Sequence, residues 1–346
     1  MNIILDQIKS SYGGDIYNFA IKLDCEIAEV LDLSSNINFL TPEIEMNLGE
    51  ISLKIYPNYE KLIHKISLQY KISKGQIELF NGGRGAIFSL LRTLHLDDCV
   101  IYSPASLEYK KAALKFGYKT HLINRFEENG DEREVPQNAL VIFANPSTPE
   151  GTFYEIENLL RFWKSKNATV LIDESYLDFT NYPSATKFLS QYENLYILKS
   201  MTKFYGAAGI RLGIVISQSC NIKYLQEFEP IWKISSFDAT YLTLALEDKI
   251  FKKVSKTLTI KNNILLDKIL NASLLFEKVY PSCGNFILAK LKSMSALEFQ
   301  KVLLPYKIKI GDCSNFDFLD KSYVRIAVKS EEDMKRFEKA IQSINK

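Results

Sequence analysis

Short apolar runs alternate with longer amphipathic segments along the middle of the chain. Seven runs have the length and the residue types of buried strands, at positions 77–80, 99–102, 120–123, 139–143, 168–172, 194–198 and 212–216. Segments between them, such as 86–94, 107–116 and 156–164, carry apolar residues every three or four positions, which predicts helices. Because alternating strands and helices are typical of a mainly parallel sheet covered on both faces, we expect an α/β fold with a seven-stranded sheet.

The pattern changes after about residue 235. Helical periodicity continues to residue 273, and strand-like runs follow near 286–289, 307–310 and 323–328, before a final amphipathic helix at 332–344. This order predicts a smaller α+β domain that the N-terminal arm joins. We expect an arm at 1–38, a large domain at 39–235 and a small C-terminal domain at 236–346.

Composition and charge narrow the class of protein. The chain has 346 residues, 47% of them hydrophobic and 24% charged, which is the profile of a globular protein with a large core. Its 43 basic and 41 acidic residues leave a net charge of +2, so no overall field indicates nucleic acid or an anionic membrane as a partner. No apolar run approaches the ~20 residues that span a bilayer, and positions 1–6 lack the features of a secretory leader. We therefore expect a cytoplasmic protein with neither kind of partner.

Cysteine and histidine usage disfavours disulfide and metal sites. The five cysteines are odd in number and form no Cys-x-x-Cys pair, which fits reduced and mostly buried thiols. His64, His95 and His121 stand at no spacing typical of metal ligands, so we expect no metal.

Three strand ends carry residues suited to chemistry, and open α/β sheets bind ligands at the carboxyl ends of their strands. The segments that follow these strands are Asp173-Glu174-Ser175-Tyr176, Asn145-Pro146-Ser147-Thr148-Pro149-Glu150-Gly151, and a third with Ser200, Lys203 and, eight positions on, Arg211. Each by itself has an ordinary interpretation, as a helix cap, a rigid loop or a surface lysine.

Together and in this order, the three segments resemble the fold-type I pyridoxal-phosphate enzymes of the class I and II aminotransferase family, and the resemblance extends over nearly the whole chain. It implies pyridoxal 5′-phosphate as the cofactor, an electron sink that needs a lysine and an acidic partner for its pyridine nitrogen. By this resemblance Lys203 forms the Schiff base and moves protons, and Asp173 keeps the ring nitrogen protonated. Asn145 and Tyr176 match the donors to the ring hydroxyl oxygen, which makes Lys203, Asp173 and Tyr176 the expected catalytic residues.

The resemblance also implies a site for the phosphate of the cofactor. Ser200 and Arg211 match the phosphate ligands of the family, and an arginine fork suits phosphate oxygens. The segment Asn81-Gly82-Gly83-Arg84-Gly85 lies between a strand and a helix, so the N–H groups of Gly83 and Arg84 can meet the phosphate at a helix N-terminus. An ordinary glycine turn is the alternative.

Two further matches concern a partner subunit and the substrate. Tyr56 matches a tyrosine that in relatives reaches the cofactor phosphate of the partner subunit, which implies a homodimer with shared active sites; an aromatic in a hydrophobic turn is the alternative. Arg325 matches the arginine that pairs with the substrate α-carboxylate, or is merely solvated if its strand lies at an edge. A departure concerns the cofactor ring: relatives have a stacking aromatic where this chain has Ser106, so either Tyr109 covers the ring or no side chain does.

The N-terminal segments bear on the reaction. Lys203, Asp173 and Arg325 suit both transamination and decarboxylation, because the bond that breaks depends on how the substrate is oriented. Tyr12-Gly13-Gly14-Asp15-Ile16 and the segment 31–38 resemble threonine-phosphate decarboxylases more than histidinol-phosphate aminotransferases. We hypothesise decarboxylation of an O-phospho-L-amino acid, phosphoserine or phosphothreonine, to a phosphorylated amino alcohol. Transamination of the histidinol-phosphate type is the alternative.

The phosphate of such a small substrate needs donors of its own. Tyr12, Asn36, Arg84 and Lys233 are the candidates, with surface charge or packing of the arm as the alternative. Phosphoserine is preferred because Tyr12, which is larger than the histidine of relatives, would crowd a β-methyl group.

Two other classes of protein fit the sequence less well. A nicotinamide dehydrogenase is disfavoured because the glycine turn at 82–85 is not Gly-x-Gly-x-x-Gly. A noncatalytic relative of the fold would be expected to lack Lys203 or Asp173, and both are present.

Overall fold

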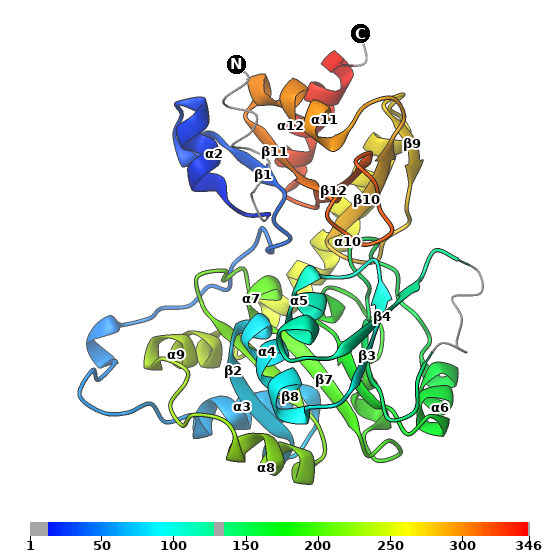
Figure 1. The fold of residues 1–346 in the computed structure, drawn as a ribbon. Coiled ribbons are helices and arrows are strands. Elements are labelled where there is room, and N and C mark those ends of the chain that lie inside the picture. The colour runs from blue at the N-terminus through cyan, green and yellow to red at the C-terminus, as the bar shows by residue number, and fades with distance from the viewer. Residues whose placement is uncertain (1–12, 128–134, 345–346) are drawn as a thin grey trace. The chain divides into compact units, whose positions relative to one another are not determined.

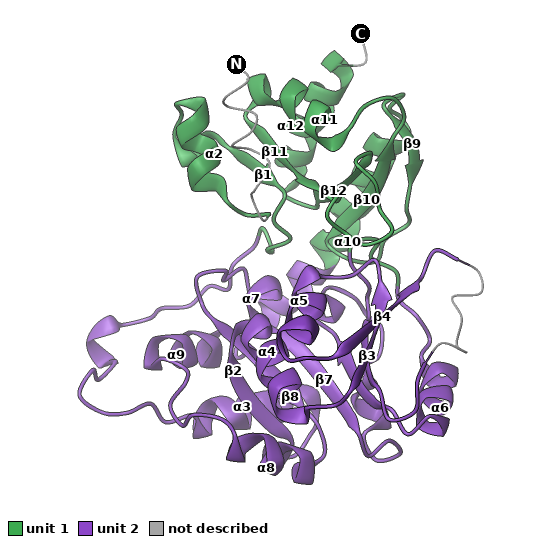
Figure 2. Ribbon diagram, viewed as in Figure 1, with its two compact units in different colours: residues 1–39, 149–152, 257–346 green, residues 40–148, 153–256 purple. Residues whose placement is uncertain are grey.

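The computed structural model describes residues 13–127 and 135–344, which form two compact units (Figures 1 and 2). The first unit comprises residues 1–39, 149–152 and 257–346, and the second comprises residues 40–148 and 153–256. Each unit is built around its own sheet.

The second unit contains a seven-stranded sheet. Its strands are β2 (Ile77–Asn81), β3 (Asp98–Ser103), β4 (Lys119–Asn124), β5 (Leu140–Ala144), β6 (Thr169–Asp173), β7 (Leu195–Ser200) and β8 (Leu212–Ile216). Their order is β2-β8-β7-β6-β5-β3-β4. The pairs from β4 across to β7 are parallel, and β8 is antiparallel to both of its neighbours. The predicted α/β fold with a seven-stranded, mainly parallel sheet is confirmed.

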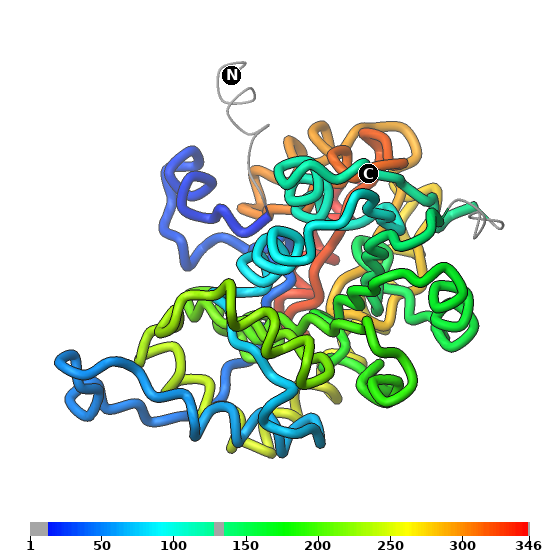
Figure 3. The backbone as a smooth tube through the Cα atoms, turned by 60° about the horizontal axis from the view of Figure 1, so that its bottom comes forward, coloured from blue at the N-terminus to red at the C-terminus, as the bar shows by residue number. Residues whose placement is uncertain are grey.

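Helices cover both faces of this sheet. They are α3 (Glu60–Tyr70), α4 (Gly82–Leu94), α5 (Leu107–Lys115), α6 (Glu157–Ser165), α7 (Met201–Phe204), α8 (Ser219–Glu227) and α9 (Ser236–Ala245). Successive residues of a strand point to opposite faces of the sheet. On one face, Ile101 and Ile142 belong to a buried cluster with residues of α4, α5 and α8. On the opposite face Trp163 of α6 packs against Tyr102 and Phe143. Residues 40–58 run along the rim of the unit beside residues 228–245 (Figures 1 and 3).

The first unit contains a five-stranded sheet in the order β1-β11-β12-β10-β9. Its strands are β1 (Leu31–Leu33), β9 (Phe276–Val279), β10 (Phe286–Leu291), β11 (Ile308–Asp312) and β12 (Tyr323–Ala327), and its helices include α2 (Ile16–Leu23), α11 (Ala296–Leu303) and α12 (Glu331–Ile344). One face buries Val324 and Ile326 against Phe299 of α11 and Phe337 of α12. The strand β1 pairs in parallel with β11, so residues 31–33 of the N-terminal arm are part of this sheet.

The boundary between the units differs from the expected one at residue 236. Helix α9 belongs to the second unit, where Tyr241 donates a hydrogen bond to the carbonyl of Tyr205 at 3.2 Å. The helix α10 (Lys249–Asn271) is shared, since Phe251 packs against Tyr205 of the second unit while Leu266 lies in the core of the first. One continuous helical periodicity runs through the boundary, so the sequence carries no signal for it.

Two absences hold for the part of the chain that is described. None of its helices is long and apolar enough to cross a membrane. Its His, Cys, Asp and Glu residues form no group of three or more that could hold a metal ion.

Candidate active site

Asp173 is the last residue of β6, at the carboxyl edge of the large sheet, and the residue is 7% exposed. Both of its oxygens accept hydrogen bonds. The backbone N–H of Ser175 donates to Oδ1 at 2.8 Å, and the hydroxyl of Tyr109 donates to Oδ2 at 2.5 Å. Two donors from different segments therefore fix the orientation of this carboxylate.

Lys203 lies in the short helix α7, directly after the neighbouring strand β7. Its Nζ lies 4.3 Å from the ring centroid of Tyr176, which follows β6. Because β6 and β7 are paired, with Asp173 opposite Leu198, the two strand ends lie at the same edge of the sheet. The structure thus brings Lys203 close to Tyr176, which lies three residues after Asp173 in the sequence.

The first residues of α4, Gly82 and Gly83, are closely packed against Ser200, Arg211 and Gly213. Gly82 has φ +72°, and a Cβ added there would lie 2.6 Å from Nη2 of Arg211. A Cβ on Gly83 would lie 3.3 Å from the Cβ of Ser200, and one on Gly213 would lie 2.6 Å from the backbone of Gly82. A helix N-terminus with a serine and an arginine beside it is suited to an anion such as phosphate. Arg84, in the first turn of the same helix, is exposed.

Asn145 follows β5, and its backbone N–H donates to the carbonyl of Asp173 at 2.9 Å. Its side-chain amide makes a two-way contact with Tyr154: Nδ2 donates to the carbonyl at 2.9 Å, and Oδ1 accepts from the backbone N–H at 2.9 Å. An amide nitrogen carries two hydrogens, so this contact uses one donor of the pair. The structure places Asn145 beside Asp173, as the sequence predicts for neighbouring strand ends.

Ser106 and Tyr109 have different surroundings from the ones expected. The hydroxyl oxygen of Ser106 accepts from the N–H of Glu108 at 3.4 Å and caps α5. Tyr109 is 1% exposed and belongs to the core on that face of the sheet. A ring so enclosed has no free face for a cofactor, so the interpretation of Tyr109 as a stacking residue does not fit the structure.

Tyr56 lies on the exposed rim of the second unit. It is 71% exposed, and its ring stacks on Trp232 with centroids 4.0 Å apart. Lys233, the next residue, forms ion pairs with Glu78 at 2.7 Å and Glu229 at 2.9 Å. Two carboxylates already balance its charge, which weakens it as a candidate for the substrate phosphate.

Arg325 lies on β12, an interior strand of the smaller sheet, and not on an edge. Its neighbours Val324 and Ile326 point into the helix-covered core, so the Arg325 side chain is on the opposite face. Its Nη2 donates to the carbonyl of Ser34 at 3.5 Å.

The two N-terminal segments pack against each other in the first unit. The N–H of Gly14 donates to Oγ of Ser34 at 2.9 Å, and a Cβ on Gly13 would lie 2.6 Å from the carbonyl oxygen of Ser34. Asn36 is buried, and its carbonyl accepts from the side chain of Asn285 at 2.8 Å. Tyr12 lies outside the described residues.

Lys329 is a partly buried lysine that sequence reasoning missed. Its Nζ donates to the carbonyls of Ser35 at 3.0 Å and Ile37 at 3.3 Å. Burial lowers the pKa of Lys329 from its ordinary value. The position of a lysine two residues after β12 is the one sequence signal for it, and that signal does not distinguish it from a surface lysine.

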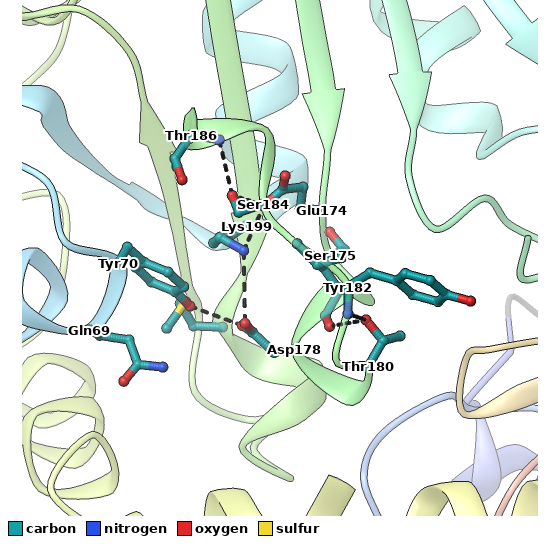
Figure 4. Close-up of polar contacts among 12 residues, drawn as sticks. Gln69, Tyr70, Glu174, Ser175, Asp178, Thr180, Tyr182, Ser184, Thr186 and Lys199 are labelled. Atoms are coloured by element: carbon teal, nitrogen blue, oxygen red, sulfur yellow. Dashed lines mark hydrogen bonds and ion pairs between the residues drawn. The ribbon is translucent and has the colours of Figure 1, made fainter. Parts of the chain in front are cut away.

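Sequence reasoning also missed a cluster of charged side chains around the buried Lys199 (Figure 4). Lys199 lies 2.8 Å from Oε2 of Glu174 and 3.8 Å from Oδ1 of Asp178, and the hydroxyl of Tyr70 donates to Asp178 at 2.9 Å. Burial opposes the charge of Lys199, but Asp178 and Glu174 outweigh it and raise the pKa of Lys199 above its ordinary 10.5. The lysine is therefore a charged member of the cluster at neutral pH.

The model of the family described as aminotransferase class I and II matches residues 52–344. The chain belongs to the class I and II aminotransferase family. Its similarities within that family include proteins named for two different reactions.

Among the relatives is the Adenosylcobalamin biosynthesis bifunctional protein CobDQ of Leptospira interrogans, at 30% identity over 96% of this chain and 41% of that protein. The chain thus spans about two fifths of the length of that relative. The threonine-phosphate decarboxylase of Salmonella typhimurium is 24% identical over 97% of this chain and 96% of its own. The crystal structure of the histidinol-phosphate aminotransferase from Clostridium acetobutylicum has a TM-score of 0.83 at 28% identity, covering 91% of this chain and 99% of that one.

The expected cofactor is confirmed, because the family depends on pyridoxal phosphate. A histidinol-phosphate aminotransferase from Sinorhizobium meliloti, with a TM-score of 0.78 at 17% identity over 97% of each chain, was crystallised with pyridoxal-5′-phosphate. The residues of this chain fit that group. They offer a lysine, a buried carboxylate with fixed orientation and a helix start so close to Arg211 that an added methyl would collide with it.

Proposed function

We propose that the protein decarboxylates an O-phospho-L-amino acid, phosphoserine or phosphothreonine, to a phosphorylated amino alcohol. The observation that carries this proposal is the packing of Gly13-Gly14 against Ser34, whose carbonyl also accepts from Arg325. These are the two N-terminal segments that resemble threonine-phosphate decarboxylases, and they lie beside the arginine expected to bind the α-carboxylate. Relatives named for threonine-phosphate decarboxylation support the same branch.

Pyridoxal phosphate, when bound, supplies an electron sink for the charge left at Cα. Lys203 would hold the cofactor through Nζ, and the same amine would deliver a proton to the carbon that has lost its carboxylate. Asp173, a buried carboxylate, would carry the negative charge that favours a proton on the ring nitrogen. Asn145 and Tyr176 would contact the ring hydroxyl oxygen, and Ser200, Arg211 and the N–H groups of Gly83 and Arg84 would hold the phosphate.

Three residues implied by the family resemblance would bind the substrate. Arg325 would bind the α-carboxylate of the substrate with its planar guanidinium group. This contact would orient the bond between Cα and the carboxylate, which is the bond that decarboxylation breaks. Asn36 and Tyr12 remain the proposed contacts of the substrate phosphate. Phosphoserine stays the preferred substrate on the size of Tyr12 alone.

We also propose that the protein is a homodimer with shared active sites. Around the rim of the second unit, exposed apolar side chains gather on residues 48–56 and 228–237: Leu48, Leu53, Ile55, Tyr56, Phe228, Ile231, Trp232 and Phe237. Apolar surface of this kind is typical of an interface. A partner that covers Tyr56 would receive it at its own cofactor site.

Aminotransferase activity of the histidinol-phosphate type is the second candidate, supported by the similarity to the Clostridium acetobutylicum enzyme. The two candidates differ in chemistry. A decarboxylase needs an α-carboxylate on its substrate and no second substrate, whereas a transaminase needs a keto acid to accept the amino group.

The deciding experiment incubates the cofactor-loaded protein with phosphoserine, phosphothreonine or histidinol phosphate, each with and without a keto acid. We expect carbon dioxide and a phosphorylated amino alcohol without keto acid, and greatly reduced turnover in Arg325→Met. The matched control Arg161→Met, at an exposed arginine of α6, should keep wild-type turnover. Turnover that depends on the keto acid would overturn the decarboxylase proposal and favour the second candidate.

A further inference from the structure

The hydroxyl of Tyr109 and the carboxylate of Asp173 are joined by a short hydrogen bond in the core of the second unit. The two residues are 64 positions apart in the sequence, and the bond from the hydroxyl to Oδ2 measures 2.5 Å. Hydrogen bonds from a hydroxyl to an ionised carboxylate have this length and are about twice as strong as those between neutral groups. The backbone N–H of Ser175 holds the other oxygen, Oδ1.

Tyr109 is well fixed in its position. It is 1% exposed and belongs to a cluster that includes Ile101, Ile142 and Leu198, while its helix α5 is capped by Ser106. Burial, and then the charge of Asp173, raise the pKa of Tyr109 well above its ordinary 10.0. The hydroxyl therefore keeps its proton at neutral pH and acts as a donor.

The terminal torsion of an aspartate is broad and roughly two-fold, so one contact leaves its carboxylate free to turn. Two donors on two oxygens remove that freedom. One donor, the backbone N–H of Ser175, lies two positions after Asp173 and does not depend on the identity of a side chain. The other comes from a separate helix and is supplied by a specific side chain.

We propose that Tyr109 is the positioning residue of Asp173: its hydroxyl fixes the orientation of the carboxylate that would meet the ring nitrogen of the cofactor. This inference rests on the proposed role of Asp173. Tyr109 itself need not touch the cofactor, because it acts through the carboxylate. Relatives have a stacking aromatic where this chain has Ser106, and the buried Tyr109 three positions on would act on the carboxylate and not on the cofactor ring.

The test separates support of the carboxylate from support of the fold. Tyr109→Phe removes only the hydroxyl. The matched control is Tyr118→Phe, another tyrosine of the same cluster, 3% exposed, whose hydroxyl donates to the carbonyl of Leu91 at 2.7 Å. The probes are pyridoxamine 5′-phosphate, which forms no bond to Lys203, and its 1-deaza analogue, in which carbon replaces the ring nitrogen. Dissociation constants are measured with the cofactor-free full-length protein.

We expect the wild type and Tyr118→Phe to bind pyridoxamine phosphate more tightly than the deaza analogue. Tyr109→Phe should bind pyridoxamine phosphate about ten-fold more weakly, because a carboxylate that is free to turn must be ordered when it meets the ring nitrogen, and should bind the deaza analogue as the wild type does. Equal weakening of both probes means a structural role only and overturns the inference. An unchanged preference in Tyr109→Phe also overturns it while Asp173 keeps its role. No preference in the wild type removes the role of Asp173 itself, and the inference with it.

Discussion

Glu174 and Lys199 form a buried ion pair of 2.8 Å, and each is next in sequence to a residue of the candidate site. Glu174 follows Asp173, and Lys199 precedes Ser200. Since side chains alternate along a strand, the pair lies on the face opposite to those two neighbours. Glu174 also accepts hydrogen bonds from Oγ of Ser184 at 2.7 Å and from the N–H of Ala185 at 2.6 Å. The ion pair therefore ties together the ends of the two strands that carry Asp173 and Ser200.

Replacing Lys199 by methionine should destabilise the protein strongly. The variant leaves the buried Glu174 and the partly buried Asp178 without their cation, and breaking a buried ion pair costs about 3–5 kcal/mol in comparable cases. The pKa of Lys199 is raised above 10.5 in the folded state, so its contribution is fully present below that pH and is lost only as the pH rises through the folded value. We expect the difference in urea midpoint between wild type and variant to be constant from about pH 7 to pH 10 and to shrink above that range.

An exposed lysine gives the control for this measurement. Lys223→Met, on the outer surface of α8, should unfold with the wild-type midpoint at every pH. A Lys199→Met protein as stable as the wild type would mean that the ion pair contributes nothing net.

Lys203→Ala should abolish covalent attachment of the cofactor. The amine at this position is the proposed point of attachment, so the yellow colour of the purified protein and its activity should both be lost. Borohydride reduction followed by peptide mass analysis should locate the adduct on the Lys203 peptide of the wild type. Lys223→Ala should trap cofactor normally, and an unmodified Lys203 peptide in cofactor-saturated wild type would refute the assignment.

Gly213→Ala should weaken cofactor binding through the start of α4. The new Cβ would lie 2.6 Å from the carbonyl carbon of Gly82 and from the N of Gly83. Relief of that overlap moves the helix start away from the proposed phosphate position, and overpacking of this kind costs about 1–3 kcal/mol. We expect about ten-fold weaker binding of pyridoxamine 5′-phosphate, measured by fluorescence titration.

Gly85→Ala is the matched control in the same helix. Its Cβ would meet nothing closer than 3.9 Å, and alanine within a helix is favoured over glycine by roughly 0.5–1 kcal/mol. This variant should bind the cofactor normally and melt slightly higher. Equal affinities for the two glycine variants would count against a phosphate site at this helix start.

Mixed subunits test whether the active sites are shared. In an equal mixture of Lys203→Ala and Tyr56→Ala chains, half of the dimers combine one chain of each kind and hold one complete site. Activity at limiting cofactor should therefore rise above that of either parent towards roughly a quarter of wild type. A mixture of Lys203→Ala with Asp173→Ala should not recover, since both residues lie in the second unit of one chain. Failure of the first mixture, or a monomer by sedimentation, would contradict the proposal.

The order of strands and helices was readable from the apolar pattern because both periodicities are local. Each of the seven strands of the large sheet lies within about two residues of its predicted position. Lys203, Asp173 and Arg211 were expected for a different reason, because three segments at strand ends together resemble the motifs of a known family, and their roles stay predictions. The unit boundary could not be predicted from the apolar pattern, because it falls within α10, whose helical periodicity continues unbroken from one unit into the other.

Local pattern thus specifies the α/β fold, and the resemblance of three sequence motifs to a family gives the residues expected to hold the cofactor. The tertiary structure decided what lies behind those residues: that Tyr109 bonds to Asp173, that Lys199 is a buried member of an ion cluster, and that Arg325 is on an interior strand. The reason is physical. A hydrogen bond or ion pair depends on distance in space, and a separation of 64 positions between Tyr109 and Asp173 leaves no periodic trace of their contact in the sequence.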